Sequence, residues 1–182
     1  MFSGSLQALT NILAYRGSLD EARATGLQAL AVTVAQNDRR FQGYAEAYLS
    51  VTEYMAGDYA HAEYYARTAA ETLADVPATR PFALALLARA LLAQNCQSEA
   101  LRSAREAYGQ LERLGVVDDG EATIRLALAE CLLAAGDMLA ARELLDKAAT
   151  RILASAEAID DSAVRESFLA RIPDNRRILE LA

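Results

Sequence analysis

The side chains that could carry out acid–base chemistry are few in this sequence. His61 is the only histidine among the 182 residues, and imidazole is the side chain that most often acts as a general base near neutral pH. A general base needs a positioned partner, but the ionisable neighbours Glu63 and Tyr64 do not share its face of a helix. We therefore expect His61 to be solvated and to take no part in catalysis.

The other groups that could bind a metal or attack a substrate are also isolated. Cys96 and Cys131 lie 35 residues apart, which is neither a metal-ligand spacing nor a redox pair, so two reduced thiols are expected. The pair Asp118–Asp119 lacks the alternating acids of a calcium loop and is interpreted as a helix cap. The sequence contains no phosphate-binding loop, dinucleotide fingerprint or paired-ligand metal helix. It therefore predicts a chain that is not an enzyme, without a catalytic residue, cofactor or metal site.

Aromatic side chains are concentrated in one stretch, where recognition is the chemistry to consider. Six of the eight tyrosines lie between residues 44 and 65. At spacings of 3, 4, 3 and 4 the sequence has Phe41, Tyr44, Tyr48, Val51 and Met55. Such spacings place all five on one face of a helix, and tyrosine is favoured at recognition surfaces because it combines a large contact area with a hydroxyl. The stripe fits either a ligand groove or packing against neighbouring helices, and spacing does not separate the two.

These residues must be positioned by a repeated pair of helices. Four times a glycine or asparagine is followed by alanine five positions later and by another alanine twelve positions later. The four sets are Gly17–Ala22–Ala29, Gly57–Ala62–Ala69, Asn95–Ala100–Ala107 and Gly136–Ala141–Ala148. Their turn residues are 40, 38 and 41 positions apart, a period typical of stacked helical hairpins. The predicted fold is all-α: a right-handed α–α superhelix, or solenoid, of about four helix-turn-helix repeats of roughly 40 residues.

Each repeat is interpreted as two antiparallel helices joined by a tight turn. The repeats are expected at about 5–36, 38–74, 81–114 and 121–159, with a C-terminal capping segment at 162–181, in a single domain of residues 1–182. Helices joined by so short a turn must approach closely, which small side chains at the crossing permit. The alanine columns supply these on the second helix, and Thr10, Ser50, Ala88 and Ala129 supply them on the first. A small stripe of Gly43, Ala47, Ser50 and Tyr54 is expected to face the helix that follows it.

Charge and hydropathy exclude several classes of partner. The formal net charge is −7 and the pI is near 4.8, with no basic stripe, so neither nucleic acid nor an anionic membrane surface is an expected partner. No apolar run approaches the roughly 20 residues needed to cross a bilayer. Met1–Phe2–Ser3 leads into a mixed helix without a basic n-region, so no signal peptide is expected. We expect a cytoplasmic protein.

Two of the turns carry a motif that points to a family. The segments Gly57-Asp58-Tyr59-Ala60-His61-Ala62 and Gly136-Asp137-Met138-Leu139-Ala140-Ala141 resemble tetratricopeptide repeats, in the longer 40-residue variety of MalT-like regulators. The resemblance covers about residues 5–159. It departs from the usual pattern because most units lack the closing proline and because Gly26, Ala66, Ala104 and Leu145 replace the usual aromatic. It implies a curved rod with a concave groove that binds a protein or peptide.

The resemblance also implies which side chains face that groove. The expected partner-binding residues are Tyr44, Tyr48, Val51, Met55, Phe82, Leu86, Arg89 and Glu130. Among these, Arg89 is placed either to anchor a peptide carboxylate or to pair with Glu130 or Glu53.

The end of the chain is similar to a second group of proteins. The segments Gly120-Glu121-Ala122, Arg165-Glu166-Ser167-Phe168-Leu169 and Ile172-Pro173-Asp174-Asn175 resemble the C-terminal tails of large bacterial signalling proteins, namely serine/threonine kinases or ATPase regulators. That resemblance implies a non-catalytic interaction or sensor region of a larger protein. The alternative is a self-association module, or homo-oligomer, that pairs through Leu6, Leu9, Ile12 and Leu13 of the first helix.

Overall fold

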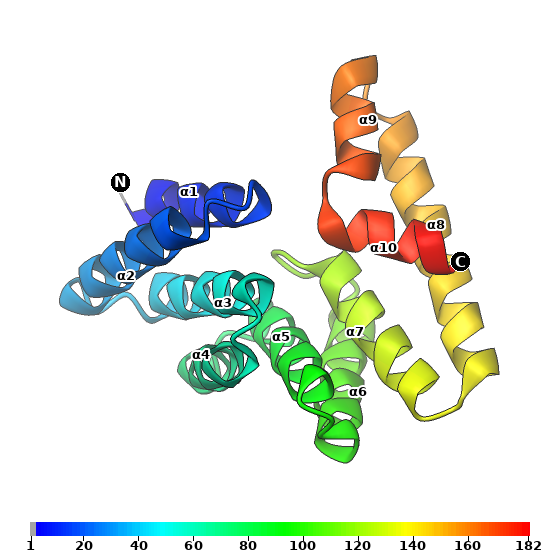
Figure 1. Ribbon diagram of the computed structural model, residues 1–182, viewed down its shortest axis with the longest axis horizontal. Helices are drawn as coiled ribbons and strands as arrows, with labels where there is room; N and C mark the ends of the chain where they lie inside the picture. The colour runs from blue at the N-terminus through cyan, green and yellow to red at the C-terminus, as the bar shows by residue number, and fades with distance from the viewer. Residues whose placement is uncertain (1–2) are drawn as a thin grey trace.

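Ten α-helices follow one another along residues 3–182, the part of the chain that this computed structural model describes, and no strand lies among them (Figure 1). Met1 and Phe2, on which part of the signal-peptide expectation rests, lie outside this range. The helices are α1 Ser3–Tyr15, α2 Leu19–Ala35, α3 Arg39–Ala56, α4 Tyr59–Thr72, α5 Arg80–Ala93, α6 Gln97–Leu114, α7 Glu121–Ala134, α8 Met138–Glu157, α9 Ser162–Ala170 and α10 Pro173–Leu181.

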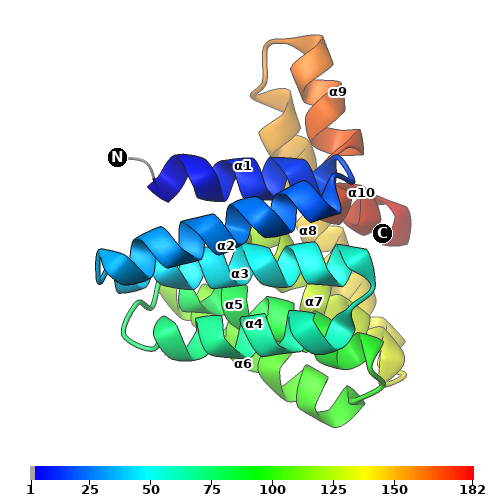
Figure 2. The same ribbon diagram turned by 60° about the vertical axis from the view of Figure 1, so that its left-hand side comes forward.

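Helices α1 to α8 form four antiparallel hairpins that stack in sequence order. Each helix packs against the next, and the first helices of successive hairpins also pack on one another, α1 on α3, α3 on α5 and α5 on α7. Figure 2 shows α1 to α4 as successive layers of this stack. The predicted right-handed all-α superhelix is confirmed, and each hairpin buries the face that its neighbour exposes.

The turn residues that begin the alanine series all end a helix in the left-handed conformation. Their φ angles lie between 63° at Asn95 and 81° at Gly17 and Gly136, a region that glycine and asparagine tolerate best. Asp58 then caps α4, because its side chain accepts a hydrogen bond from the backbone N–H of His61. Asp137 caps α8 in the same way, whereas the side chain of Ser18, at the N-cap of α2, makes no such hydrogen bond.

The alanine columns lie where the paired helices cross. All eight column alanines are at most 2% exposed, and so are the small residues Thr10, Ser50, Ala88 and Ala129 on the opposing helices. The hydroxyl of Ser50 donates a 2.8 Å hydrogen bond to the backbone oxygen of Ala62, so its polar atom is satisfied at the crossing. The predicted packing role of these columns is confirmed.

A glycine of α3 lies directly against a side chain at the end of α4. A Cβ atom built on Gly43 would lie 2.3 Å from Cγ of Leu73, a side chain that is itself fully buried. The expectation that the small stripe of α3 faces α4 is thereby confirmed at this end, and Gly43 is required by space rather than by backbone conformation.

Replacing Gly43 by alanine should therefore destabilise the fold, although alanine is the better helix former. We expect Gly43→Ala to lower the free energy of unfolding by about 1–3 kcal/mol, the usual cost of overpacking a core. Gly109→Ala is the matched control in α6, since its Cβ would meet only the flexible end of Arg113 at 3.6 Å, and it should gain about 0.5–1 kcal/mol. Urea unfolding of the two variants measures both values, and a gain in Gly43→Ala would contradict the packing.

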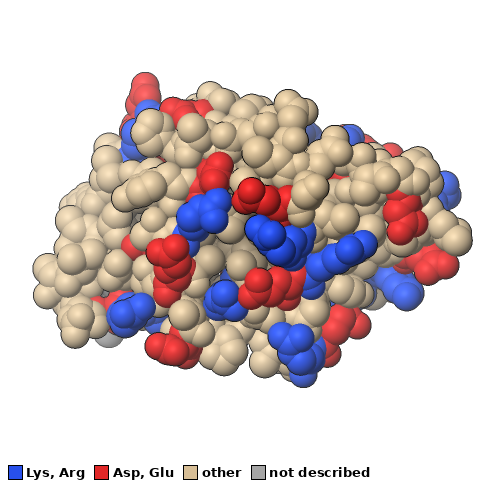
Figure 3. Space-filling model, turned by 90° about the horizontal axis from the view of Figure 1, so that it is seen from below, with Lys and Arg blue, Asp and Glu red and all other residues tan. Residues whose placement is uncertain are grey.

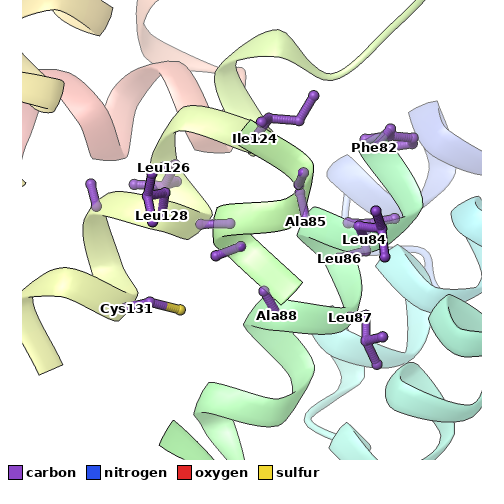
Figure 4. Packing of buried hydrophobic residues seen from close by; sticks show 14 of the residues in the cluster. Phe82, Leu84, Ala85, Leu86, Leu87, Ala88, Ile124, Leu126, Leu128 and Cys131 are labelled. Atoms are coloured by element: carbon purple, nitrogen blue, oxygen red, sulfur yellow. The ribbon is translucent and has the colours of Figure 1, made fainter. Parts of the chain in front are cut away.

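Helices α5 and α7 are apolar on nearly all sides because other helices surround them. Figure 4 shows residues of α5, among them Phe82 and Leu86, in one cluster with Ile124 and Leu126 of α7. A helix with apolar residues all round its circumference is typical of a buried position. These two helices therefore form the buried centre of the stack.

The loop between α6 and α7 folds back onto α3 instead of capping α7. Gly120, with φ 78°, holds the N-cap position and no side chain caps this helix. Asp118 accepts hydrogen bonds from Arg40 (2.8 Å) and Thr79 (3.0 Å). Asp119 accepts one from the hydroxyl of Tyr48 at 2.6 Å. The interpretation of this acidic pair as a helix cap is therefore wrong: the two carboxylates bind side chains that precede them by 39 to 78 residues.

The surface carries both signs of charge. On the face shown in Figure 3, acidic and basic side chains are interspersed, without a broad area of either sign. Across residues 3–182, no helix is both long enough and apolar enough to cross a bilayer.

Candidate functional site

A pocket on the inner side of the superhelix contains most of the residues that the sequence marks for binding. This inner pocket has a volume of about 90 Å³. Five of the eight expected partner-binding residues line it, namely Val51, Met55, Phe82, Leu86 and Arg89. Its other walls are formed by Tyr15, Ser50, Tyr54, Thr123, Pro173 and Asp174, none of which was an expected partner-binding residue. The pocket is thus mostly apolar, with an arginine and an aspartate in its wall, the usual composition of a recognition site.

Tyr44 and Tyr48, also expected in the groove, instead pack within the protein. Their rings are stacked with centroids 6.0 Å apart, and Tyr48 meets Phe82 edge-on at 6.0 Å. The Tyr48 hydroxyl donates to Asp119, as described above, so the α6–α7 loop covers this part of α3. Burial, reinforced by the charge of Asp119, raises the pKa of Tyr48 well above its ordinary value. The first half of the aromatic stripe therefore packs against other side chains, and its second half, Val51 and Met55, lines the inner pocket.

Arg89 is the central charged group of the inner pocket. Its Nη1 atom lies 2.8 Å from Oδ1 of Asp174, and its Nε atom lies 3.5 Å from Oε2 of Glu130 without forming a hydrogen bond. Its guanidinium also lies over the ring of Tyr54, 4.9 Å from the centroid. Burial by itself would lower the pKa of Arg89, but the carboxylates of Asp174 and Glu130 outweigh it, so the pKa is raised. The side chain is 16% exposed and therefore forms its ion pairs largely out of water.

Of the two pairing partners that the sequence suggested for Arg89, the structure provides one. Glu130 is near it, as expected, whereas Glu53 binds Arg23 through two hydrogen bonds of 2.7 Å. The stronger partner, Asp174, lies 85 residues further along the chain. Its second carboxylate oxygen accepts a hydrogen bond from the hydroxyl of Thr123. No spacing in the sequence indicates this contact, because α10 has no place in the repeat pattern.

A larger pocket adjoins the inner pocket. This side pocket has a volume of about 300 Å³ and shares Tyr15, Thr123 and Asp174 with the inner pocket. Both of its arginines pair with one acid, since Glu121 lies 3.0 Å from Arg125 and 2.6 Å from Arg151. Burial, followed by the nearby Asp174 and Asp119, raises the pKa of Tyr15 to about 12, so this hydroxyl is protonated near neutral pH.

The groups that could do chemistry lie apart from both pockets. His61 is exposed on α4, with Nδ1 2.7 Å from Oδ2 of the helix cap Asp58. Cys96 is exposed and Cys131 is buried, and burial together with Glu130 raises the pKa of the Cys131 thiol to about 12. Within the described residues, no cluster of three or more histidine, cysteine, aspartate or glutamate side chains is arranged to hold a metal ion. The lining of the two pockets consists of apolar side chains and ion-paired charged groups, which can contact a ligand.

One buried carboxyl outside the pockets makes stability depend on pH. Glu46 is buried in α3, where Gln42 donates a 2.8 Å hydrogen bond to Oε1 while Oε2 has no hydrogen-bond partner. Burial raises the pKa of Glu46, which means that the folded chain binds this proton more tightly than the unfolded chain does. Stability should therefore fall as the pH rises from the ordinary glutamate value of 4.5 through the raised folded value.

Replacing the Glu46 carboxylate by an uncharged side chain should abolish this fall in stability with rising pH. We expect Glu46→Gln to be more stable than the natural chain by about 1 kcal/mol at pH 7 and equal to it near pH 4, since a poorly solvated charge costs at least that much. Urea unfolding over this pH range measures the difference. The exposed Glu143 supplies the control, because Glu143→Gln should leave the pH profile unchanged.

Among the solved structures that share this fold, two match nearly the whole chain. One is a crystal structure of nearly identical TPR-like repeats from a Podosopora anserina protein described as a kinesin light chain; the identity is 16% and the TM-score 0.62, over 97% of this chain and 91% of that chain. A glutamine-to-methionine variant of that protein matches at 16% identity with a TM-score of 0.63, over 99% and 93% of the respective chains. No family model matches the sequence, and no curated protein matches it either. At this identity the likeness establishes the fold, a TPR-like helical repeat.

Proposed function

We propose that this chain is a non-catalytic scaffold whose inner pocket binds a segment of a protein or peptide partner. The observation that carries the proposal is the convergence of three successive inner helices on one pocket, where Met55, Leu86 and Thr123 come from α3, α5 and α7. An apolar pocket with a few placed polar groups suits a side chain of an extended or helical segment. TPR-like repeats commonly act as scaffolds for such partners, which supports the proposal.

A selection from a phage-displayed library of random peptides tests this function. We expect peptides that share a sequence motif to be enriched on the immobilised chain. Met55 is 38% exposed, so Met55→Glu can alter the pocket without unfolding the core. We expect the affinity of the selected peptide for this variant to fall about tenfold or more.

Leu139→Glu is the control for the added charge, because Leu139 is 73% exposed on α8 and lies outside the pocket. Binding of the selected peptide should be unchanged by this substitution. The proposal fails if no motif is enriched, or if Met55→Glu and Leu139→Glu bind the selected peptide equally well.

The wider context of this scaffold is a proposal of the same kind. The segments at 120–122, 165–169 and 172–175 support its placement as the C-terminal interaction region of a larger, cytoplasmic bacterial signalling protein. The complete reading frame tests this placement, since an upstream kinase or ATPase domain is expected.

The exposed apolar face of α1 favours self-association as a second candidate. Leu9 is 44% exposed and Ile12 is 54% exposed, while Leu6 and Leu13 are partly covered. Because α1 lies at one end of the stack, a second copy can cover this face. Sedimentation velocity over a range of concentrations decides the matter: dimers that Ile12→Glu abolishes support this candidate, and monomers at every concentration rule it out.

A further inference from the structure

The C-terminal segment departs from the repeat pattern at the place where it meets the inner pocket. Helix α9 packs on α8, and α10 then turns back to pack on α7 and α8 (Figure 1). Pro173 and Asp174, at the start of α10, consequently form part of the wall of the inner pocket. The chain thus places its own end at the site proposed for the partner.

Polar contacts anchor this helix to the inner surface. The Asp174 carboxylate bridges Arg89 of α5 and Thr123 of α7. Further along α10, Arg177 lies 3.7 Å from Glu130 of α7. These contacts are those that a side chain of a bound segment would make, since a carboxylate meets a guanidinium and a hydroxyl.

The apolar contribution to this attachment comes mostly from partly covered side chains, since Phe168, Leu169, Leu179 and Leu181 pack against the core without being fully buried. Within α10, Ile178 is the one apolar side chain that is buried, and α9 has no buried residue at all. Both helices have nine residues, a length at which an isolated helix is marginal in water. The segment can therefore detach at a lower cost than any of the four hairpins, whose crossings are fully buried.

Detachment of α10 would change the binding site itself. Asp174 lines both pockets, so its withdrawal would open the space of about 90 Å³ to the adjoining space of about 300 Å³. The guanidinium of Arg89 and the hydroxyl of Thr123 would then be available to a ligand. We propose that α10 is an internal ligand of the inner surface, which closes the site until a partner segment with an acidic side chain takes the place of Asp174. This inference rests on the proposed function only for the identity of the displacing partner.

Hydrogen–deuterium exchange on the full chain, without any partner, tests the internal ligand. Asp174→Asn retains the shape of the side chain and removes its charge, so the amides from Arg176 to Ala182 should exchange about tenfold faster, while those of α5 and α7 keep their protection. The control is Asp161→Asn, because Asp161 caps α9 through the backbone N–H groups of Ala163 and Val164. This control should leave the exchange of α10 unchanged.

A synthetic peptide with the sequence of residues 172–182 supplies the second measurement. Labelled with a fluorophore, it should bind full-length Asp174→Asn at least about tenfold more tightly than the natural chain, because the natural α10 competes for the same site. The same peptide with asparagine in place of its aspartate should not bind.

Either of two results would overturn the internal ligand. In the first, the exchange of α10 is the same in Asp174→Asn as in the natural chain, or rises only together with that of α5 and α7. In the second, the peptide binds the natural chain and Asp174→Asn equally. Both measurements use only this chain and its own segment, so the library selection can fail while the internal ligand stands, and the reverse.

Discussion

Arg89→Met should lower the free energy of unfolding by about 3–5 kcal/mol, the cost of removing one partner from a buried ion pair. Methionine retains the apolar stem but leaves Asp174 and Glu130 without their shared cation. The Asp174 side chain is 9% exposed, so water cannot replace the lost guanidinium without local opening. Urea unfolding followed by circular dichroism measures the change.

The size of this effect depends on which partner is removed. Asp174→Asn should lower the free energy of unfolding less than Arg89→Met does, because Arg89 still has the Glu130 carboxylate 3.5 Å away. The double variant should lower the free energy of unfolding by less than the sum of the two single variants, since it removes both charges of the pair.

Arg142→Met is the control. Arg142 and Asp146 form an exposed pair on α8, with side chains 66% and 58% exposed, so this variant should change the free energy of unfolding by no more than about 0.5 kcal/mol. Equal losses for Arg89→Met and Arg142→Met would contradict the central role of Arg89.

The second large effect is expected in the alanine columns. Ala62→Leu should destabilise the chain by about 3 kcal/mol, the upper end of the range for overpacking, because Ala62 is fully buried where α3 and α4 cross. Leucine cannot be accommodated without separating the two helices, and separation would also break the bond between the Ser50 hydroxyl and the Ala62 backbone oxygen. Thermal unfolding of the purified variant should show a clearly lowered midpoint.

Ala60→Leu provides the matched comparison on the same helix. Ala60 is exposed, so the same change in side chain should alter the free energy of unfolding by no more than about 0.5 kcal/mol. If Ala62→Leu were as mild as Ala60→Leu, the alanine columns would be a consequence of composition and would have no part in the packing.

Much of the fold could be predicted because the repeated features are local. A left-handed turn residue, a capping aspartate such as Asp58 and an alanine five positions after the turn act within one hairpin. Their recurrence at about 40 residues then implies a stack, since each hairpin needs a neighbour to cover its apolar face. The positions of Val51, Met55, Phe82 and Leu86 were implied by the resemblance to tetratricopeptide repeats, and all four residues line the inner pocket.

Other parts of the site could not be predicted in this way. The acidic pair Asp118–Asp119 has the local pattern of a helix cap, yet it binds side chains of α3 because the curved stack brings the α6–α7 loop against them. Tyr15 belongs to the inner pocket only because the curvature carries the end of α1 toward α10. Neither contact has a signal in the local sequence.

The amino-acid sequence by itself determined that the chain forms alanine-packed helical hairpins and that they stack in order, and the resemblance to tetratricopeptide repeats implied that one face of α3, α5 and α7 is turned inward. Only the tertiary structure decided which side chains meet on that inner face, and above all that Asp174 pairs with Arg89 across 85 residues. The physical reason is that hairpin geometry depends on neighbours a few positions apart, whereas the curvature of a superhelix is the sum of small rotations over every hairpin. Contacts between residues far apart in the chain, such as the one between Arg89 and Asp174, follow only from this summed curvature.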